Sequence, residues 1–210
     1  MLNPEQRERV RQAVDAAEEH LAAEIVPCVF AQSSPYPETV WAGAAGGAAL
    51  ACAAFLIADL FKPVWASVAA LTTTVAAAGI VGAAAGLWCG PVKRFFIGAH
   101  RLDDAVQRRA KEIFFDRGVA CTKSRNGVLL FASVLERRVV VLADKAVRAK
   151  VAPEAWRPVV EILAASAAEG RVADGLVAAV RETASVLRAA GVVGRGGHEL
   201  DDAPVEGDGR

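Results

Sequence analysis

The chain has 210 residues, and its 24 lysine and arginine residues balance its 24 aspartate and glutamate residues. This zero net charge excludes the overall basic character that is typical of nucleic-acid-binding proteins, so no nucleic acid partner is expected. The charges are unevenly distributed, because residues 39–90 contain only Asp59 and Lys62. A charge-free stretch of more than about 18 residues is typical of a transmembrane helix, and this region is long enough for two.

The segment before the apolar region predicts one helix and one strand. Asn3, Pro4 and Gln6 are the residue types that favour the N-cap, the first position and the reciprocal capping position of a helix. The segment Glu24–Phe30 predicts a β-strand, in which Pro27 favours an edge position or a local irregularity.

The apolar region predicts two transmembrane helices, at about residues 39–60 and 64–89, with Asp59, Lys62 and Pro63 at the turn between them. A helix of about 22 residues rises roughly 33 Å, which is enough to cross the hydrocarbon core of a bilayer. The alternative is a buried helical hairpin in a soluble protein, but such helices usually keep a polar face. The sequence therefore predicts a two-span, multi-pass protein of the cell membrane.

Basic residues predict the orientation of these spans. Lys93, Arg94 and Arg101 follow the second span closely, whereas the turn offers only Lys62. Since cytoplasmic loops carry an excess of lysine and arginine, we expect both termini in the cytoplasm. The same three residues are candidates for contact with anionic lipid head groups at the membrane surface, although the topology signal explains them equally well.

Small residues recur with GxxxG spacing in both predicted spans, at Gly43 and Gly47 and at Gly82, Gly86 and Gly90. Such faces let helix backbones approach closely in lipid. They predict close packing of the two spans and leave open a homo-oligomer formed through the same faces. The middle of each span lacks an ionisable residue, which argues against an ion or proton pathway.

The segment after the membrane region predicts helices and a β-hairpin. The hairpin is joined by a short charged turn, Leu135–Arg137, and we expect Glu136, Arg137 and Arg138 to be solvated. The elements expected in chain order are a helix over 102–114, strands over Val128–Val134 and Arg138–Leu142, and helices over 153–169 and 172–190.

The two soluble segments are expected to share one core. The first is too small to fold alone, so residues 1–38 and 91–190 together predict a single α/β (α+β) domain, which the hairpin at 39–90 interrupts. The remaining residues, 191–210, are rich in glycine and acidic residues and predict a disordered tail.

Three stretches of this domain resemble the TPM-domain family. They are "NGVLL" at Asn126–Leu130, "RRV" at Arg137–Val139 and the helix start at Gly170–Leu176. The chain looks most like a membrane-hairpin subgroup of bacterial membrane proteins. The resemblance implies a sheet of about four strands flanked by helices. Some members are similar to acid phosphatases or bind calcium in an acidic cleft, and others assist the assembly or repair of membrane complexes.

Acidic residues at turns and helix starts are the candidate metal ligands. Calcium and magnesium prefer oxygen ligands, so Asp144 and Asp174 are candidates, with Asn126 as a neutral oxygen donor and with Asp103 and Asp104. Each aspartate also has an ordinary explanation as a turn residue or as a helix-start acid. No DxD spacing, nucleophile motif or glycine-rich phosphate loop accompanies them, and no catalytic residue is assigned.

Two functions therefore remain open. The first is a non-catalytic interaction or accessory module on the cytoplasmic face of the membrane, bound to a membrane or cytoplasmic protein. The alternative is a membrane-tethered phosphatase that depends on calcium or magnesium.

Overall fold

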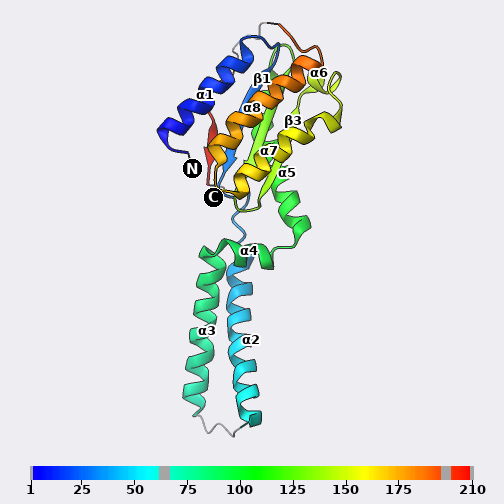
Figure 1. Cartoon of the computed structure of the whole chain (residues 1–210). Coiled ribbons are helices and arrows are strands. Elements are labelled where there is room, and N and C mark those ends of the chain that lie inside the picture. The colour runs from blue at the N-terminus through cyan, green and yellow to red at the C-terminus, as the bar shows by residue number, and fades with distance from the viewer. Residues whose placement is uncertain (1, 62–66, 195–199, 209–210) are drawn as a thin grey trace. The chain divides into compact units, whose positions relative to one another are not determined.

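The computed structural model describes residues 2–61, 67–194 and 200–208. The chain folds into two units. The first, called here the sheet unit, comprises residues 1–34 and 103–210, and the second, the hairpin unit, comprises residues 35–102 (Figure 1).

The sheet unit is α+β and contains a four-stranded mixed sheet, as the resemblance implied. The strands are β1 (Glu24–Phe30), β2 (Gly127–Ser133), β3 (Arg138–Ala143) and β4 (Val205–Gly207). Their order is β3-β2-β1-β4. Strand β1 is parallel to both β2 and β4, whereas β2 and β3 form the predicted antiparallel hairpin.

Helices cover both faces of this sheet. The helices of the sheet unit are α1 (Pro4–Glu18), α5 (Ala99–Asp116), which begins in the hairpin unit, α6 (Lys145–Arg148), α7 (Arg157–Ala168) and α8 (Val172–Ala189). Two short 3₁₀ turns lie at Val119–Cys121 and Pro153–Trp156. The core on one face is formed with α1, α7 and α8, and the core on the other face with α5.

The alternation of side chains along β1 explains the two cores. Ile25 and Val29 point to the face of α1 and α8, while Val26, Cys28 and Phe30 point to the face of α5. Successive side chains of a strand point to opposite faces, so a strand that is buried on both faces has no polar alternation. All seven residues of β1 are buried.

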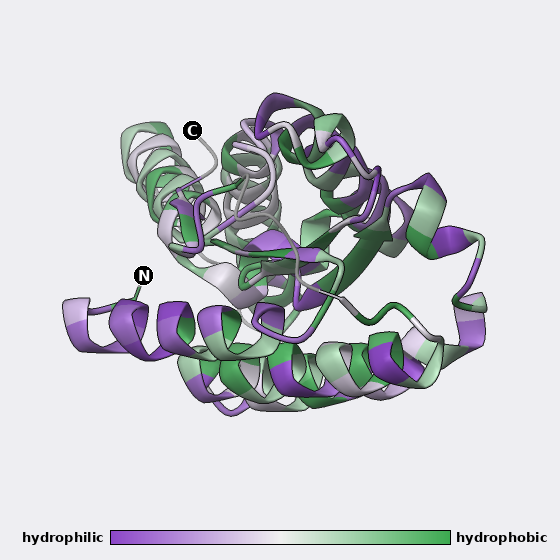
Figure 2. Ribbon diagram, turned by 90° about the horizontal axis from the view of Figure 1, so that it is seen from above, coloured by the Kyte–Doolittle hydropathy of each residue, from purple (hydrophilic) through white to green (hydrophobic). Residues whose placement is uncertain are grey.

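Helix α1 begins as the sequence predicted. The side chain of Asn3 accepts a hydrogen bond from the Gln6 N–H at 2.7 Å, and the Asn3 N–H donates to Oε1 of Gln6 at 2.9 Å. This reciprocal capping box satisfies two backbone donors that a helix start leaves without partners. Hydrophilic residues predominate in the first part of this helix (Figure 2).

Pro27 lies where β1 has no neighbour on one side. The Ala31 N–H donates to the Gly207 carbonyl of β4, and along a strand these groups alternate between the two neighbours, so the Pro27 nitrogen faces the β4 side as well. Strand β4 first pairs at Cys28. Strand β1 therefore has neighbours on both sides only from Cys28 onward. Pro27, which has no N–H, lies just before this point, where the β4 side of β1 is still an edge.

The prediction of a disordered tail is wrong for Val205–Gly207, which form β4. Glu206 accepts hydrogen bonds from the Leu2 N–H at 3.0 Å and from Nε of Arg7 at 2.6 Å. Gly207 packs against the ring of Phe30, which lies where a Cβ atom would be. These contacts with distant residues stabilise a segment whose local sequence does not favour a strand.

The hairpin unit consists of α2 (Glu38–Phe61), α3 (Val68–Trp88) and α4 (Gly90–Phe96). Helices α2 and α3 are long and apolar enough to cross a membrane, and the most apolar 18 residues of each are not buried. Asp59 lies in the last turn of α2, whereas the predicted turn residues Lys62 and Pro63 fall outside the described residues. The short helix α4 was not predicted.

Glycines bring α2 and α3 into backbone contact. A Cβ atom on Gly43 would lie 2.2 Å from the Gly82 carbonyl oxygen, and one on Gly86 would lie 2.2 Å from the Thr39 carbonyl oxygen. The Thr39 hydroxyl is also 2.9 Å from the Gly86 carbonyl oxygen, to which it donates. The close packing that these small faces predicted for the two spans is therefore present within the chain, and a homo-oligomer formed through the same faces stays a prediction.

Candidate functional site

Asn126 and Asp144, two of the three predicted metal ligands, lie next to each other where β2 begins and β3 ends. Antiparallel pairing places Val128 opposite Ala143, and the Asp144 N–H donates to the Gly127 carbonyl oxygen at 2.8 Å. Asn126 and Asp144 are only 7% and 3% exposed. Strand pairing therefore brings these two candidate ligands to the same end of the β2–β3 hairpin.

Asp144 is bound by groups of the chain itself. Nε of Arg125 lies 2.9 Å from one carboxylate oxygen, and the Lys145 N–H donates to the other at 2.7 Å. The second contact makes Asp144 the N-cap of α6. A buried carboxylate is stable only when it is paired and hydrogen-bonded, and the guanidinium and the cap supply both conditions.

Asn126 links the start of β2 to the segment that precedes β1. Its side-chain Nδ2 donates to the Ala22 carbonyl oxygen at 2.8 Å, and its backbone N–H donates to Oγ1 of Thr122 at 3.2 Å. Its buried Oδ1 has no hydrogen-bond partner among the described residues. Oδ2 of Asp144 also accepts no hydrogen bond among the described residues, but it pairs with Arg125.

Asp174 is placed away from this pair. It lies in the first turn of α8 and pairs with Arg9 of α1, whose Nη2 lies 2.7 Å from its carboxylate. Just beyond the other end of α8, Val193 bridges to Leu21, next to the segment that Asn126 contacts. A helix of 18 residues is about 27 Å long, so α8 separates Asp174 from Asn126 and Asp144.

The described residues do not fit a calcium site. Calcium takes about six to eight oxygen ligands. Within the part of the chain that the structure describes, no three histidine, cysteine, aspartate or glutamate side chains converge to hold a metal ion. Asp103 pairs with Arg138 at 2.5 Å, and a cation beside Asp144 would meet the guanidinium of Arg125.

A second polar cluster, at the opposite end of β1 and β2, was missed. Oγ of Ser33 donates to Oγ of Ser133 at 2.8 Å, and Ser133 donates in turn to the Glu136 carboxylate. The other oxygen of Glu136 accepts from the Ser33 N–H at 2.8 Å. The expectation of a solvated turn is wrong for Glu136, which is only 1% exposed. Its carboxylate is buried because it accepts hydrogen bonds that link the segment after β1 to the β2–β3 turn.

Glu18 is a buried acid near the start of β1. Its Oε1 accepts a hydrogen bond from the Ile25 N–H at 2.5 Å, and only 3% of the residue is exposed. The pKa of Glu18 is raised to about 8, mainly by burial and also by the neighbouring Glu24 carboxylate, although the hydrogen bond from the Ile25 N–H lowers it. The carboxyl is therefore mostly protonated near neutral pH.

The three predicted membrane-surface residues lie in the hairpin unit. Lys93 and Arg94 are in the last turn of α4, next to Phe95, which is 84% exposed. Arg101 pairs with Glu38, the first residue of α2, at 2.8 Å. A short helix with exposed aromatic side chains and half-buried basic side chains has the composition of a membrane-interface segment.

Comparisons with known proteins identify the domain and the fold. Residues 95–186 match the family model of the TPM domain. The fold is similar to the NMR structure of the BA42 protein from the psychrophilic bacterium Bizionia argentinensis, with a TM-score of 0.59 and 16% sequence identity over 99% of this chain and 96% of that chain. At this identity the likeness concerns the fold alone. No curated protein matches the chain.

Proposed function

We propose that the chain, whose residues 95–186 match the TPM domain model, is a member of the TPM-domain family and an integral protein of the cell membrane. Its sheet unit acts there as a non-catalytic interaction or accessory module on the cytoplasmic face, where it binds a membrane or cytoplasmic protein.

The surface of the hairpin unit supports the membrane location. Large apolar side chains point outward along both helices, including Leu50, Leu60 and Ile80, which are 74%, 84% and 70% exposed. Exposing such a surface to water costs about 25 cal/mol of free energy for each Å² of apolar area. In a bilayer the lipid chains solvate the same surface, and this cost does not arise. The lengths of α2 and α3, about 36 Å and 32 Å, match the thickness of a bilayer core. This exposed apolar surface is the observation that carries the proposal.

The packing of the hairpin supports a common side for both flanks. Thr39 near the start of α2 contacts Gly86 near the end of α3, so the chain enters and leaves the hairpin at the same end. Lys93, Arg94 and Arg101 follow at that end, and the positive-inside rule then favours the cytoplasm for both termini.

The placement of the acidic residues favours a binding module over the alternative, a calcium- or magnesium-dependent phosphatase. Phosphatases of that kind use metal ions to activate water and to neutralise the charge of the phosphate. Here Asp144 is bound by Arg125, and Asp174 by Arg9, on different parts of the sheet unit. An enzyme would have to break both ion pairs and bring the two carboxylates together.

A titration with metal ions separates the two functions. We expect calcium or magnesium up to millimolar concentration to leave the unfolding midpoint of the full chain in detergent unchanged. A ligand that binds only the folded state would raise the unfolding free energy with the logarithm of its concentration. Asp144→Asn keeps the helix cap but removes the negative charge, and is expected to cost about 1 kcal/mol in either case. A metal-dependent rise that Asp144→Asn abolishes would establish the phosphatase alternative instead.

A further inference from the structure

A groove with arginine rims runs between α1 and α8. Its volume is about 480 Å³. Its floor consists of small or apolar side chains of both helices, and three arginines lie along it. The lining residues are Arg9, Gln12, Ala13, Ala16, Ala17, Val177, Arg181, Ala184 and Arg188.

The sequence spacing explains why these residues share a surface. On α8, Val177, Arg181, Ala184 and Arg188 recur at intervals of three or four residues, which places them on one side of a helix. Alanines on α1 meet this side at the same spacing. The small side chains leave a hollow along the contact between the two helices, and the long arginines stand beside it.

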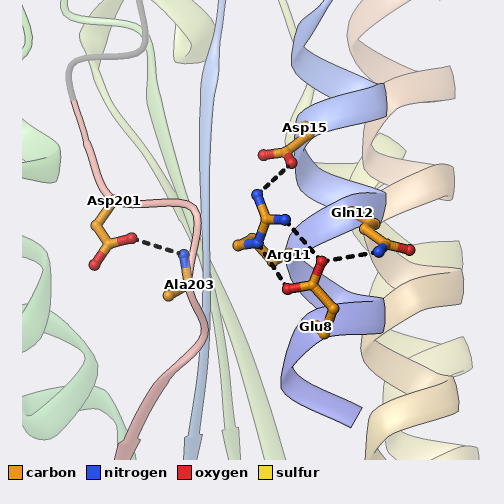
Figure 3. Close-up of polar contacts among 6 residues, drawn as sticks. All are labelled: Glu8, Arg11, Gln12, Asp15, Asp201 and Ala203. Carbon is orange, nitrogen blue, oxygen red and sulfur yellow. Dashed lines mark hydrogen bonds and ion pairs between the residues drawn. The ribbon is translucent and has the colours of Figure 1, made fainter. Parts of the chain in front are cut away.

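Two of these arginines have no acidic partner in the part of the chain that the structure describes. Arg9 pairs with Asp174. Arg181 and Arg188 are exposed and form no ion pair with any residue that the structure describes. The opposite situation is found elsewhere on α1, where Arg11 lies between Glu8 and Asp15 at 2.7 Å and 2.8 Å (Figure 3).

The charge of Arg11, which lies on α1 outside the groove, is therefore neutralised within the helix. The pKa of Glu8 is lowered to about 2 by its hydrogen bonds with Arg11 and Gln12. Since Arg11 already pairs with two carboxylates, an external anion would have to compete with both of them to bind there. The groove, by contrast, presents cationic groups that a ligand can pair without displacing another residue.

We propose that this groove binds an acidic segment of a partner protein, with carboxylates of the segment paired to Arg181 and Arg188. These two residues are seven positions apart, which corresponds to about 10.5 Å along α8. A peptide can present two carboxylates at this spacing and lay small apolar side chains on the alanine floor between them. Guanidinium groups suit this role because they bind carboxylates in a bidentate geometry.

The inference rests on the proposed function, because it names the chemistry of the partner that the module binds. Its probe is a synthetic 15-residue helical peptide of alanine and leucine, labelled with fluorescein, that carries glutamates seven positions apart. Binding to the full-length protein in detergent is followed by fluorescence anisotropy. We expect Arg181→Gln and Arg188→Gln each to weaken binding about twofold to fivefold, and the double variant Arg181→Glu with Arg188→Glu to weaken it more than about tenfold.

Matched controls separate the groove from general charge attraction. Arg157→Gln removes an exposed arginine of α7 outside the groove, and we expect it to leave the dissociation constant unchanged. The same peptide with glutamine in place of glutamate should bind at least about fivefold more weakly. The unfolding midpoint of each variant shows that it remains folded.

Several outcomes would overturn the inference. They are the absence of peptide binding at millimolar concentration, equal effects of Arg157→Gln and the groove variants, and equal binding of the neutral peptide. Displacement by inorganic phosphate, but not by chloride at equal ionic strength, would assign the groove to a phosphate ligand instead. None of these results affects the membrane location or the metal titration. The proposed function is therefore tested independently of the groove.

Discussion

Replacing Gly82 with alanine is expected to push α2 and α3 apart and to destabilise the hairpin unit by about 1–3 kcal/mol. The added Cβ atom would lie 2.1 Å from the Gly43 carbonyl oxygen and 2.9 Å from its carbon. Backbone atoms cannot move out of the way as a flexible side chain can, so the helices must separate. In water, alanine stabilises a helix by about 1 kcal/mol relative to glycine. If Gly82→Ala nevertheless destabilises the hairpin unit, the cause is the contact of the new Cβ atom and not helix propensity.

The control for this prediction is Gly79→Ala, one turn earlier on α3. A Cβ atom at Gly79 would lie 3.5 Å from the Ala44 carbonyl oxygen, an ordinary contact distance. Both variants gain the same helix propensity and differ only in the space available. The free energy of unfolding in mixed micelles of dodecylmaltoside and dodecyl sulfate measures the effect. Equal stabilities for the two variants would refute close backbone packing of α2 and α3.

The stability of the sheet unit is expected to fall as the pH rises from about 5 to about 8, because of Glu18. Its pKa in the folded chain is raised to about 8 from the ordinary value of 4.5. The folded state therefore holds a proton that the unfolded state has released, and its stability is fully present below the unfolded pKa and is lost as the pH rises through the folded pKa. One pKa unit corresponds to about 1.4 kcal/mol, so the loss is on the order of 3 kcal/mol.

Glu18→Gln should remove this dependence. The amide keeps an oxygen that can accept the hydrogen bond from the Ile25 N–H, but it has no proton to release. We expect the variant to be more stable than the wild type at pH 8 and to change little between pH 5 and pH 8. Glu19→Gln changes an exposed neighbour and serves as the charge control. Urea unfolding at a series of pH values gives the comparison, and parallel curves for all three proteins would contradict the account.

Local patterns were sufficient to predict the elements whose stability is local. The capping box of Asn3 and Gln6 fixes the start of α1, and the apolar run Glu24–Phe30 corresponds to β1 residue for residue. Gly170 and Gly191, which were expected to end the last two helices, have φ angles of 75° and 70°. Only glycine adopts such angles at little cost, so the sequence signal is strong at these positions.

Features that depend on distant contacts could not be predicted in this way. Strand β4 has three residues, and its pairing with β1 and its contacts with Leu2 and Arg7 stabilise it. The same limit applied to the candidate metal ligands. Asn126 and Asp144 meet because β2 and β3 pair, but a sequence does not show which end of α8 lies beside them, and Asp174 lies at the other end.

The buried Glu136 and the groove beside Arg181 were missed for a related reason. A charged residue in a turn is usually solvated, and here hydrogen bonds from two serines at separate strand ends make burial of the Glu136 carboxylate more favourable. Arginines on an amphipathic helix likewise have the pattern of an ordinary solvated face. Their position next to the alanines of α1 becomes visible only when the two helices are packed.

Labelling of single cysteines tests the membrane account most directly. In a chain whose native cysteines are replaced, Ser67→Cys marks the start of α3 and Ser185→Cys marks the exposed surface of α8. We predict that a membrane-impermeant maleimide labels Ser67→Cys in intact spheroplasts and labels Ser185→Cys only after permeabilisation, with the protein retained in alkali-washed membranes. Labelling of both sites in intact spheroplasts, or release of the protein from the membranes by alkali, would contradict a two-span protein with a cytoplasmic sheet unit.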